Sequence, residues 1–146
     1  MNSWKRRAFW ILSRSGLAVY SRFPVFGPLR VSVGIARKDG GFLVIERADG
    51  RGLSFPGGIA MPREGTEQAM AREFAEETGM RVTRSQLKFS YFSDSEVPVN
   101  LHVFEVEAEG SLRDSWEGTP RWVPRAGLQE RLLPSQRRIL DSYPEH

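Results

Sequence analysis

The sequence predicts an α+β fold in which helices cover a mixed β-sheet. Its 146 residues fit one compact domain. Hydrophobic residues make up 40% of the chain and charged residues 27%, close to the average of globular proteins, which excludes a disordered or low-complexity chain. The expected elements run in the order helix, strands, helix, strands, helix, and this order favours a mixed sheet flanked by helices.

The absence of cysteine limits the chemistry. With no cysteine in the sequence, disulfides, thiolate metal sites and cysteine nucleophiles are excluded. A chain without disulfides is compatible with a reducing compartment, and we expect a cytoplasmic protein.

Residues 1–28 are predicted to form a basic helical arm, followed by a single folded domain over residues 29–146. Residues 1–30 contain six basic groups and no acidic group, whereas the rest contains 15 basic and 18 acidic groups. At helical spacing one face of this amphipathic helix carries Trp4, Ala8, Ile11 and Leu12. Its apolar run is too short for a signal peptide or a membrane span. Packing on its own domain or on a second copy in a homodimer is favoured, and binding to a membrane surface or an RNA 5′ end is the alternative.

The first strands follow this arm. Residues 30–37 alternate large and small apolar side chains, which predicts a strand with one crowded face. The turn residues 38–41 lead to a second strand over 42–46, so the two are expected to form a hairpin. A short strand over 53–55 ends at Pro56-Gly57-Gly58.

The second half begins with the most regular helix of the chain. It is predicted over residues 66–78, with Thr66 as its N-cap and Gly79 as a left-handed C-terminal residue. Strands are expected over 87–92, 99–108 and 121–123. Pro134 is placed to start a last helix over 135–143.

The helix over 66–78 carries an unusual group of carboxylates. Glu73, Glu76 and Glu77 share one side, while Met70 and Phe74 mark the core side. Like charges at this spacing cost about 0.2–0.5 kcal/mol per pair, and anions are disfavoured at a helix C-terminus. A hard cation such as Mg²⁺ or Mn²⁺ would relieve this repulsion. Helical geometry points the adjacent Arg72 away from the centre of the group.

Residues 58–80 resemble the Nudix box, the signature of hydrolases that act on nucleoside diphosphates linked to another moiety. All nine specified positions match: Gly58, Glu64, Arg72, Glu73, Phe74, Glu76, Glu77, Gly79 and Met80. With the flanking strand order, the resemblance extends over residues 29–142. It implies an α/β/α sandwich in which the box forms a loop, a helix and a second loop.

The resemblance also implies roles for individual residues. Glu73 and Glu77 would be the main metal ligands, and Glu76 a further ligand or the group that acts on the attacking water. The backbone carbonyl of Gly57 would complete the metal site. Glu64 would orient the site from the preceding loop, and Arg72 would support it by pairing with a glutamate of the box.

The activity implied is divalent-metal-dependent hydrolysis of a phosphoanhydride bond in a nucleoside diphosphate derivative or nucleotide, by metal-activated water. The cofactor would be Mg²⁺ or Mn²⁺. The box does not fix the general base, which would be a box glutamate or a residue of a later loop. Glu117 is our candidate outside the box and Glu96 a weaker one. A catalytically weak Nudix-like domain that senses a nucleotide is the alternative.

Substrate contacts are less specified by the sequence. Arg47 and Arg51 flank the loop that leads to the box and are candidates for phosphate binding. Phe55 and Tyr91 are candidates for stacking on a base, or for simple packing. His102 lies within a strand pattern and is interpreted as structural.

Overall fold

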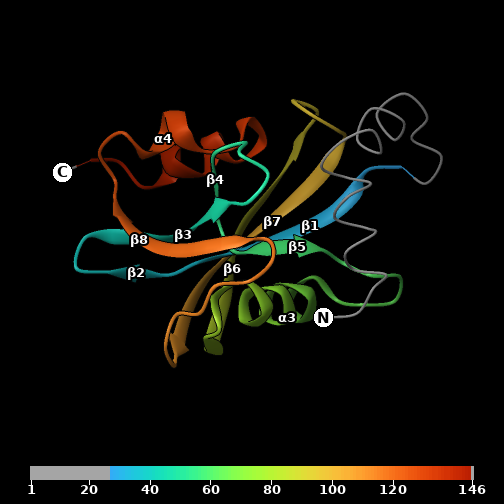
Figure 1. Ribbon diagram of the computed structural model, residues 1–146. Coiled ribbons are helices and arrows are strands. Elements are labelled where there is room, and N and C mark those ends of the chain that lie inside the picture. The colour runs from blue at the N-terminus through green and yellow to red at the C-terminus, as the bar shows by residue number, and fades with distance from the viewer. Residues whose placement is uncertain (1–26, 146) are drawn as a thin grey trace.

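A computed structural model describes residues 27–145, and the predicted amphipathic helix of the arm lies outside them. In Figure 1 the strands form a central layer, with the helix over residues 66–78 on one side and the helix over residues 128–131 on the other. The elements in chain order are β1 (Leu29–Ile35), β2 (Arg37–Lys38), β3 (Gly41–Arg47), β4 (Leu53–Ser54), β5 (Gly57–Ile59), α3 (Thr66–Thr78), β6 (Arg81–Ser93), β7 (Val99–Glu109), β8 (Gly118–Pro124), α4 (Leu128–Arg131) and the 3₁₀ helix η1 (Pro134–Ser142). The predicted α+β class and its sandwich arrangement are confirmed.

The central layer consists of two four-stranded sheets. The first has the order β5-β1-β7-β6, with β1 and β7 parallel and the other neighbours antiparallel. In the second, β3 pairs with β2, β4 and β8, all antiparallel. The first sheet is therefore mixed, as the sequence predicts for the sheet of this domain.

The expected hairpin between residues 30–37 and 42–46 is only partly correct. The chain leaves the first sheet after Ile35, and only the short β2 pairs with β3 around the turn. Strand β1 pairs with β5 and β7 instead. The hairpin was predicted from neighbouring residues alone, whereas β7, which pairs with all seven residues of β1, is distant in the sequence.

Helix α3 has the predicted bounds, although its N-cap is Gly65 and not Thr66. Gly65 has extended backbone angles, and no side-chain hydrogen bond caps this end of the helix. The prediction for Gly79 is confirmed, since its φ is 80° and its N–H donates to the Ala75 carbonyl at 3.0 Å.

Other boundaries differ from the prediction. Strand β6 starts at Arg81, well before the expected residue 87, and β5 and α4 were not predicted. The last helix is a 3₁₀ helix that starts at Pro134 rather than a regular α-helix. Short strands and 3₁₀ turns carry little periodic signal, because their conformation depends on the partners that pack on them.

Two hydrophobic clusters hold the layers together. The cluster under α3 is centred on the fully buried Met70 and Phe74. These side chains pack closely on β1 because Gly34 has no Cβ: a methyl there would lie 2.9 Å from Phe74 Cδ2. The second cluster joins the opposite face of the sheets to α4 and η1, and it includes Val33, Phe42 and Ile139. Small residues of β1 let α3 pack closely on this face of the strand, which is therefore crowded as the sequence predicts.

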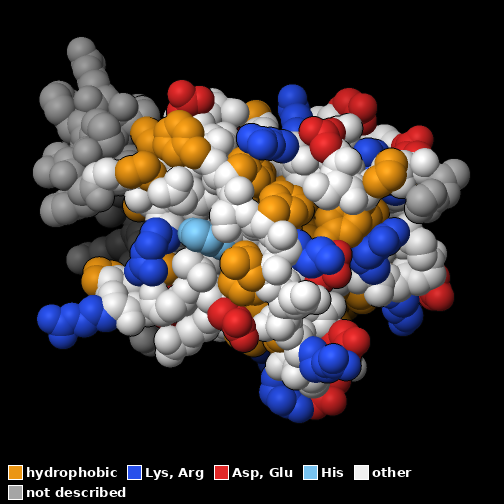
Figure 2. All heavy atoms as spheres, turned by 180° about the vertical axis from the view of Figure 1, so that it is seen from behind, with side chains coloured by type: hydrophobic (Ala, Val, Ile, Leu, Met, Phe, Trp, Pro, Cys, Tyr) orange, Lys and Arg blue, Asp and Glu red, His pale blue; other side chains and the backbone are white. Residues whose placement is uncertain are grey.

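The face seen in Figure 2 carries basic and acidic side chains side by side. Along β6 and β7, cross-strand ion pairs join Arg81 to Glu109 and Lys88 to Glu105. These pairs are largely exposed, so each contributes little to stability. No helix among residues 27–145 is long and apolar enough to cross a membrane.

Candidate functional site

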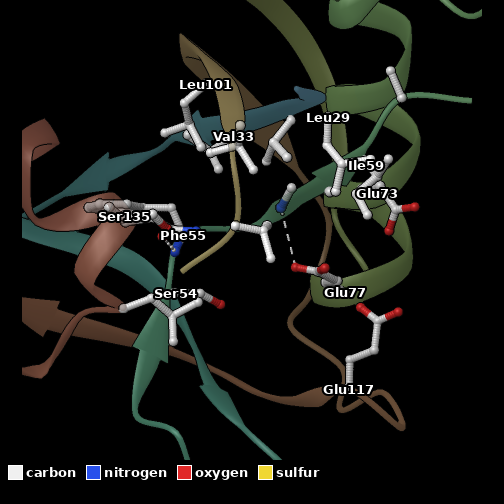
Figure 3. A pocket seen from close by; sticks show the side chains of 18 of the residues that line it. Leu29, Val33, Ser54, Phe55, Ile59, Glu73, Glu77, Leu101, Glu117 and Ser135 are labelled. Atoms are coloured by element: carbon white, nitrogen blue, oxygen red, sulfur yellow. Dashed lines mark hydrogen bonds between the residues drawn. The ribbon is translucent and has the colours of Figure 1, made fainter. Parts of the chain in front are cut away.

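The central feature of the site is a group of three carboxylates, Glu73, Glu77 and Glu117. One oxygen from each lies within 4.8 Å of one oxygen from each of the others. Glu73 and Glu77 project from the last turns of α3, and Glu117 comes from the loop that precedes β8. In Figure 3 the three side chains converge at one side of a pocket. Residues 40 positions apart in the sequence thus form one acidic group.

Local structure explains how Glu117 reaches this group. The Glu117 N–H donates to Ser115 Oγ at 3.2 Å, and its carbonyl accepts from the Ala48 N–H at 2.9 Å. Gly118 follows in close contact with β3, where a Cβ would lie 2.2 Å from the Glu46 carbonyl oxygen. The loop is therefore fixed against the end of β3, with Glu117 facing α3.

Burial and mutual repulsion raise the pKa values of the α3 carboxylates. Burial, followed by the charge of Glu117, raises the pKa of Glu73 to about 7, and Arg72 only partly opposes this effect. The pKa of Glu77 is also raised, first by burial and then by Glu117. Without a cation, the group therefore retains protons near neutral pH.

This chemistry fits a hard divalent cation. The ligand set consists of carboxylate oxygens only, which Mg²⁺ and Mn²⁺ prefer. Burial and mutual repulsion disfavour negative charge on Glu73 and Glu77, and a bound cation would offset both effects. Glu73, Glu77 and Glu117 are the residues that would hold the ion.

Gly57 lets β5 lie close to β1, and Gly58 lets β5 lie close to Glu73 of the acidic group. A Cβ at Gly57 would lie 2.0 Å from the Ser32 carbonyl oxygen, and one at Gly58 would lie 2.8 Å from Glu73 Cδ. The Gly57 N–H donates to Glu77 Oε2 at 3.2 Å, the interaction dashed in Figure 3. The role expected for the Gly57 carbonyl stays a prediction, since the contact observed involves its amide.

Arg72 lies between the acidic group and the preceding loop. Its Nε and Nη2 donate to the two oxygens of Glu64, both at 2.8 Å, and its Nη1 donates to Glu73 Oε1 at 2.5 Å. Hydrogen bonding to Glu64, opposed by burial and reinforced by Glu73, raises the pKa of Arg72. The helical-wheel expectation that Arg72 points away from the group is wrong, because its guanidinium binds Glu73. The pairing with a box glutamate that the resemblance implies is present in the structure.

Glu76 lies outside the three-carboxylate group. One of its oxygens is 3.9 Å from Arg72 Nη1, and its side chain is 25% exposed. The helix therefore divides its carboxylates by position: Glu73 and Glu77 face the pocket, and Glu76 lies beside Arg72.

A cavity of about 410 Å³ extends from the acidic group. Its apolar walls come mainly from β1, β7 and the segments leading into β7 and η1: Leu29, Val31, Val33, Val97, Val99, Leu101 and Leu133. Figure 3 shows Ser135 and Phe55 across the pocket from the three carboxylates. The cavity therefore joins an acidic end to an apolar space large enough for a planar organic group.

The far end of the cavity contains Gln136, which sequence reasoning missed. Its side chain is 6% exposed, and its Oε1 accepts the Phe55 N–H at 2.7 Å. This bond fixes the orientation of the amide, because a backbone N–H can only donate. The only sequence signal was its position just after Pro134.

The two arginines predicted to bind phosphate both line the cavity but are already paired. Arg47 Nη2 lies 2.5 Å from Asp49 Oδ2, close to the Glu117 loop. Its hydrogen bond and charge lower the pKa of Asp49, although burial alone would raise it. Arg51 pairs with Glu96. Glu96 also accepts a hydrogen bond from Ser135 of η1, so it lies beside η1 and not among the three carboxylates.

The remaining candidates have structural contacts. Phe55 is 2% exposed and packs edge-on against Phe42 with ring centroids 6.2 Å apart. The Tyr91 hydroxyl donates to the Ser135 carbonyl at 2.6 Å. His102 Nδ1 lies 2.9 Å from Ser90 Oγ, and burial followed by the charge of Arg30 lowers its pKa.

Comparisons with known proteins agree with this arrangement. A family model of the NUDIX domain matches residues 28–143. A MutT-like protein of Streptomyces ambofaciens is 36% identical over 100 residues, which cover 67% of this chain and 64% of that protein, so the match spans less than two thirds of the relative's length.

Solved structures give the same result for the fold. The ORF135 protein of E. coli has a TM-score of 0.69 at 26% identity, over 80% of this chain and 89% of that one. A MutT NUDIX hydrolase of Burkholderia pseudomallei has a TM-score of 0.67 at 20% identity, over 80% and 98% of the two chains. The match to the family model covers most of the chain and includes all three clustered carboxylates, so this chain belongs to the Nudix hydrolase family.

Proposed function

We propose that this protein hydrolyses a phosphoanhydride bond in a nucleotide or nucleoside diphosphate derivative, with Mg²⁺ or Mn²⁺ as cofactor. The observation that carries the proposal is the convergence of Glu73, Glu77 and Glu117 at one end of a cavity with apolar walls. The acidic end suits a cation with bound phosphates, and the apolar space suits a base.

The residues around the cavity divide the work. Glu73, Glu77 and Glu117 would hold the cation, with the Gly57 carbonyl as a further ligand. When bound, the cation would neutralise phosphate charge and make water a stronger nucleophile at neutral pH. Glu117 moves in this scheme from candidate base to ligand.

Arg72 and Glu64 would keep Glu73 in place, since the arginine bridges the two carboxylates. Glu76, beside Arg72 at the edge of the site, would act on the attacking water or on a further cation. Arg47 lies near enough to the Glu117 loop to meet a phosphate after exchanging its partner Asp49. Arg51 would bind a phosphate from the loop between β3 and β4.

The test is phosphate release from nucleoside di- and triphosphates, ADP-sugars, dinucleotides and 5′-triphosphorylated RNA, with Mg²⁺ or Mn²⁺ and with EDTA. Glu117→Gln keeps the shape of the side chain and removes its charge. Glu67→Gln is the matched control, because Glu67 is exposed on α3, bonds Ser85 and does not line the cavity. We expect metal-dependent release that falls by at least about a hundredfold in Glu117→Gln and persists in the control.

Failure has two forms with different meanings. Absence of release together with metal-dependent nucleotide binding would favour the nucleotide sensor. Release that is unaffected by EDTA or by Glu117→Gln would contradict the assignment of the site.

The remaining expectations stay predictions. They are a cytoplasmic location, a homodimer, and contacts of residues 1–28 with a membrane or an RNA 5′ end. Most of the arm lies outside the described residues.

A further inference from the structure

Arg30, at the start of β1, holds the loop that leads from β5 to α3. Its Nη1 donates to the Glu64 carbonyl and its Nη2 to the Met61 carbonyl, each at 2.9 Å. The main-chain carbonyl of Arg30 accepts the Ala60 N–H at 2.8 Å. One residue of β1 therefore binds this loop at three points.

The loop is strained where Arg30 holds it. Arg63, between the two bound carbonyls, has a φ of 69°, a left-handed conformation that non-glycine residues seldom adopt. The turn is closed by the Glu64 N–H, which donates to the Met61 carbonyl at 3.0 Å. Such a conformation persists only when surrounding contacts fix it, and the guanidinium of Arg30 supplies two of them.

The held loop orients the carboxylate of Glu64. Glu64 Oε1 accepts the Met61 N–H at 3.0 Å and also Arg72 Nη2 at 2.8 Å. Arg72 in turn donates to Glu73 Oε1 at 2.5 Å. An uninterrupted series of hydrogen bonds thus runs from Arg30 through the loop, Glu64 and Arg72 to Glu73 of the acidic group.

From this series we propose that Arg30 is a positioning residue, which sets the metal affinity of the acidic group by fixing the loop that carries Glu64. The inference rests on the proposed function, because it assumes that Glu73 binds a cation. Arg30 is not among the residues that line the cavity, so it acts through the loop and not on substrate. The planar guanidinium matches two carbonyls at once, which the single ammonium of lysine does only in part.

The experiment compares Arg30→Ala and Arg30→Lys with a control, Arg84→Ala. Arg84 is an exposed arginine of β6 whose nearest ion-pair partner is Glu107 at 4.0 Å. The measurements are Mn²⁺ affinity by calorimetry without substrate, amide hydrogen exchange of the loop without metal, and kcat and KM for the best nucleotide found.

Loss of a residue that supports a metal ligand typically costs tenfold or more in affinity, and Arg30 acts one step further away. In Arg30→Ala we therefore expect Mn²⁺ affinity and kcat to fall by about three- to tenfold, with KM unchanged within about twofold. Exchange of the Glu64 amide should accelerate, Arg30→Lys should recover part of the loss, and Arg84→Ala should match the wild type.

A double-mutant cycle with Glu64→Gln tests the route of the effect. If Arg30 acts through Glu64, Arg30→Ala will weaken Mn²⁺ binding much less in the Glu64→Gln background. An undiminished effect there, or wild-type Mn²⁺ affinity in Arg30→Ala, would overturn the inference. A wild-type protein that neither binds Mn²⁺ nor hydrolyses any substrate would instead refute the proposed function, and with it this role.

Discussion

Replacing Glu77 with glutamine should stabilise the metal-free protein and abolish its stabilisation by metal. Glu77 is 8% exposed, and its carboxylate lies within 4.8 Å of those of Glu73 and Glu117. At an effective dielectric constant of about 20, two unit charges at that separation repel by about 3.5 kcal/mol. Glutamine removes the charge, and its Oε1 is placed to accept the Gly57 N–H that Glu77 accepts at 3.2 Å.

Protons retained by the group reduce the gain, so we expect about 1–3 kcal/mol in the free energy of unfolding at pH 8. For a domain of this size the melting temperature should rise by about 3–10 °C in EDTA. In the wild type, Mn²⁺ at a hundred times its dissociation constant should add about 2.7 kcal/mol, and this increment should disappear in Glu77→Gln.

The assay is thermal unfolding followed by circular dichroism at pH 8, in EDTA and in millimolar Mn²⁺. Glu67→Gln is the matched control, because Glu67 is an exposed residue of the same helix that accepts a hydrogen bond from Ser85 Oγ at 3.0 Å. We expect the two variants to differ in both conditions. A Glu77→Gln protein that is less stable than the wild type in EDTA, yet still gains stability from Mn²⁺, would refute the reasoning.

Three further outcomes follow from the same geometry. Gly58→Ala should fold but lose Mn²⁺ affinity by at least about tenfold, since its Cβ would meet the movable side chain of Glu73 at 2.8 Å. Gly57→Ala should instead lose several kcal/mol of stability, because its Cβ would lie 2.0 Å from the rigid Ser32 carbonyl oxygen. Calorimetry measures the first effect and urea unfolding the second. The pKa of Glu73 is raised to about 7 in the folded protein. Its contribution to the stability of the metal-free protein is therefore present below pH 4.5 and lost as the pH rises through 7, by at most about 3 kcal/mol. Equal urea midpoints at pH 5 and pH 8 would contradict this. Gln136→Leu leaves the buried Phe55 N–H without its 2.7 Å acceptor and should cost about 1–3 kcal/mol in urea unfolding.

The sequence by itself determined the elements whose periodicity is strong and the motif they carry. The bounds of α3 and the left-handed Gly79 followed from local patterns, because amphipathic spacing and a terminal glycine act within a few residues. The repulsion among closely spaced glutamates likewise indicated a cation before any fold was known.

Only the tertiary structure decided which carboxylates act together. Glu117 joins Glu73 and Glu77 because the loop before β8 is fixed against β3, a contact between residues about 70 positions apart. Glu76 is not part of this group, although helical spacing predicts that it shares a side with Glu73 and Glu77. Its carboxylate lies beside Arg72 instead, and only the packed structure shows this.

The roles of the arginines depended on the fold for the same reason. Arg51 is paired with Glu96 and Arg30 reaches the loop before α3, and neither contact has a local sequence signal. For Arg72 the box implied a glutamate partner, and the fold supplies two, Glu64 and Glu73. Long flexible side chains bind whichever partner packing brings within reach. Arg30 reaches the loop because β1 pairs with β5 and β7 in the folded sheet. Local patterns fix conformation, whereas the choice among distant charged partners is made by packing.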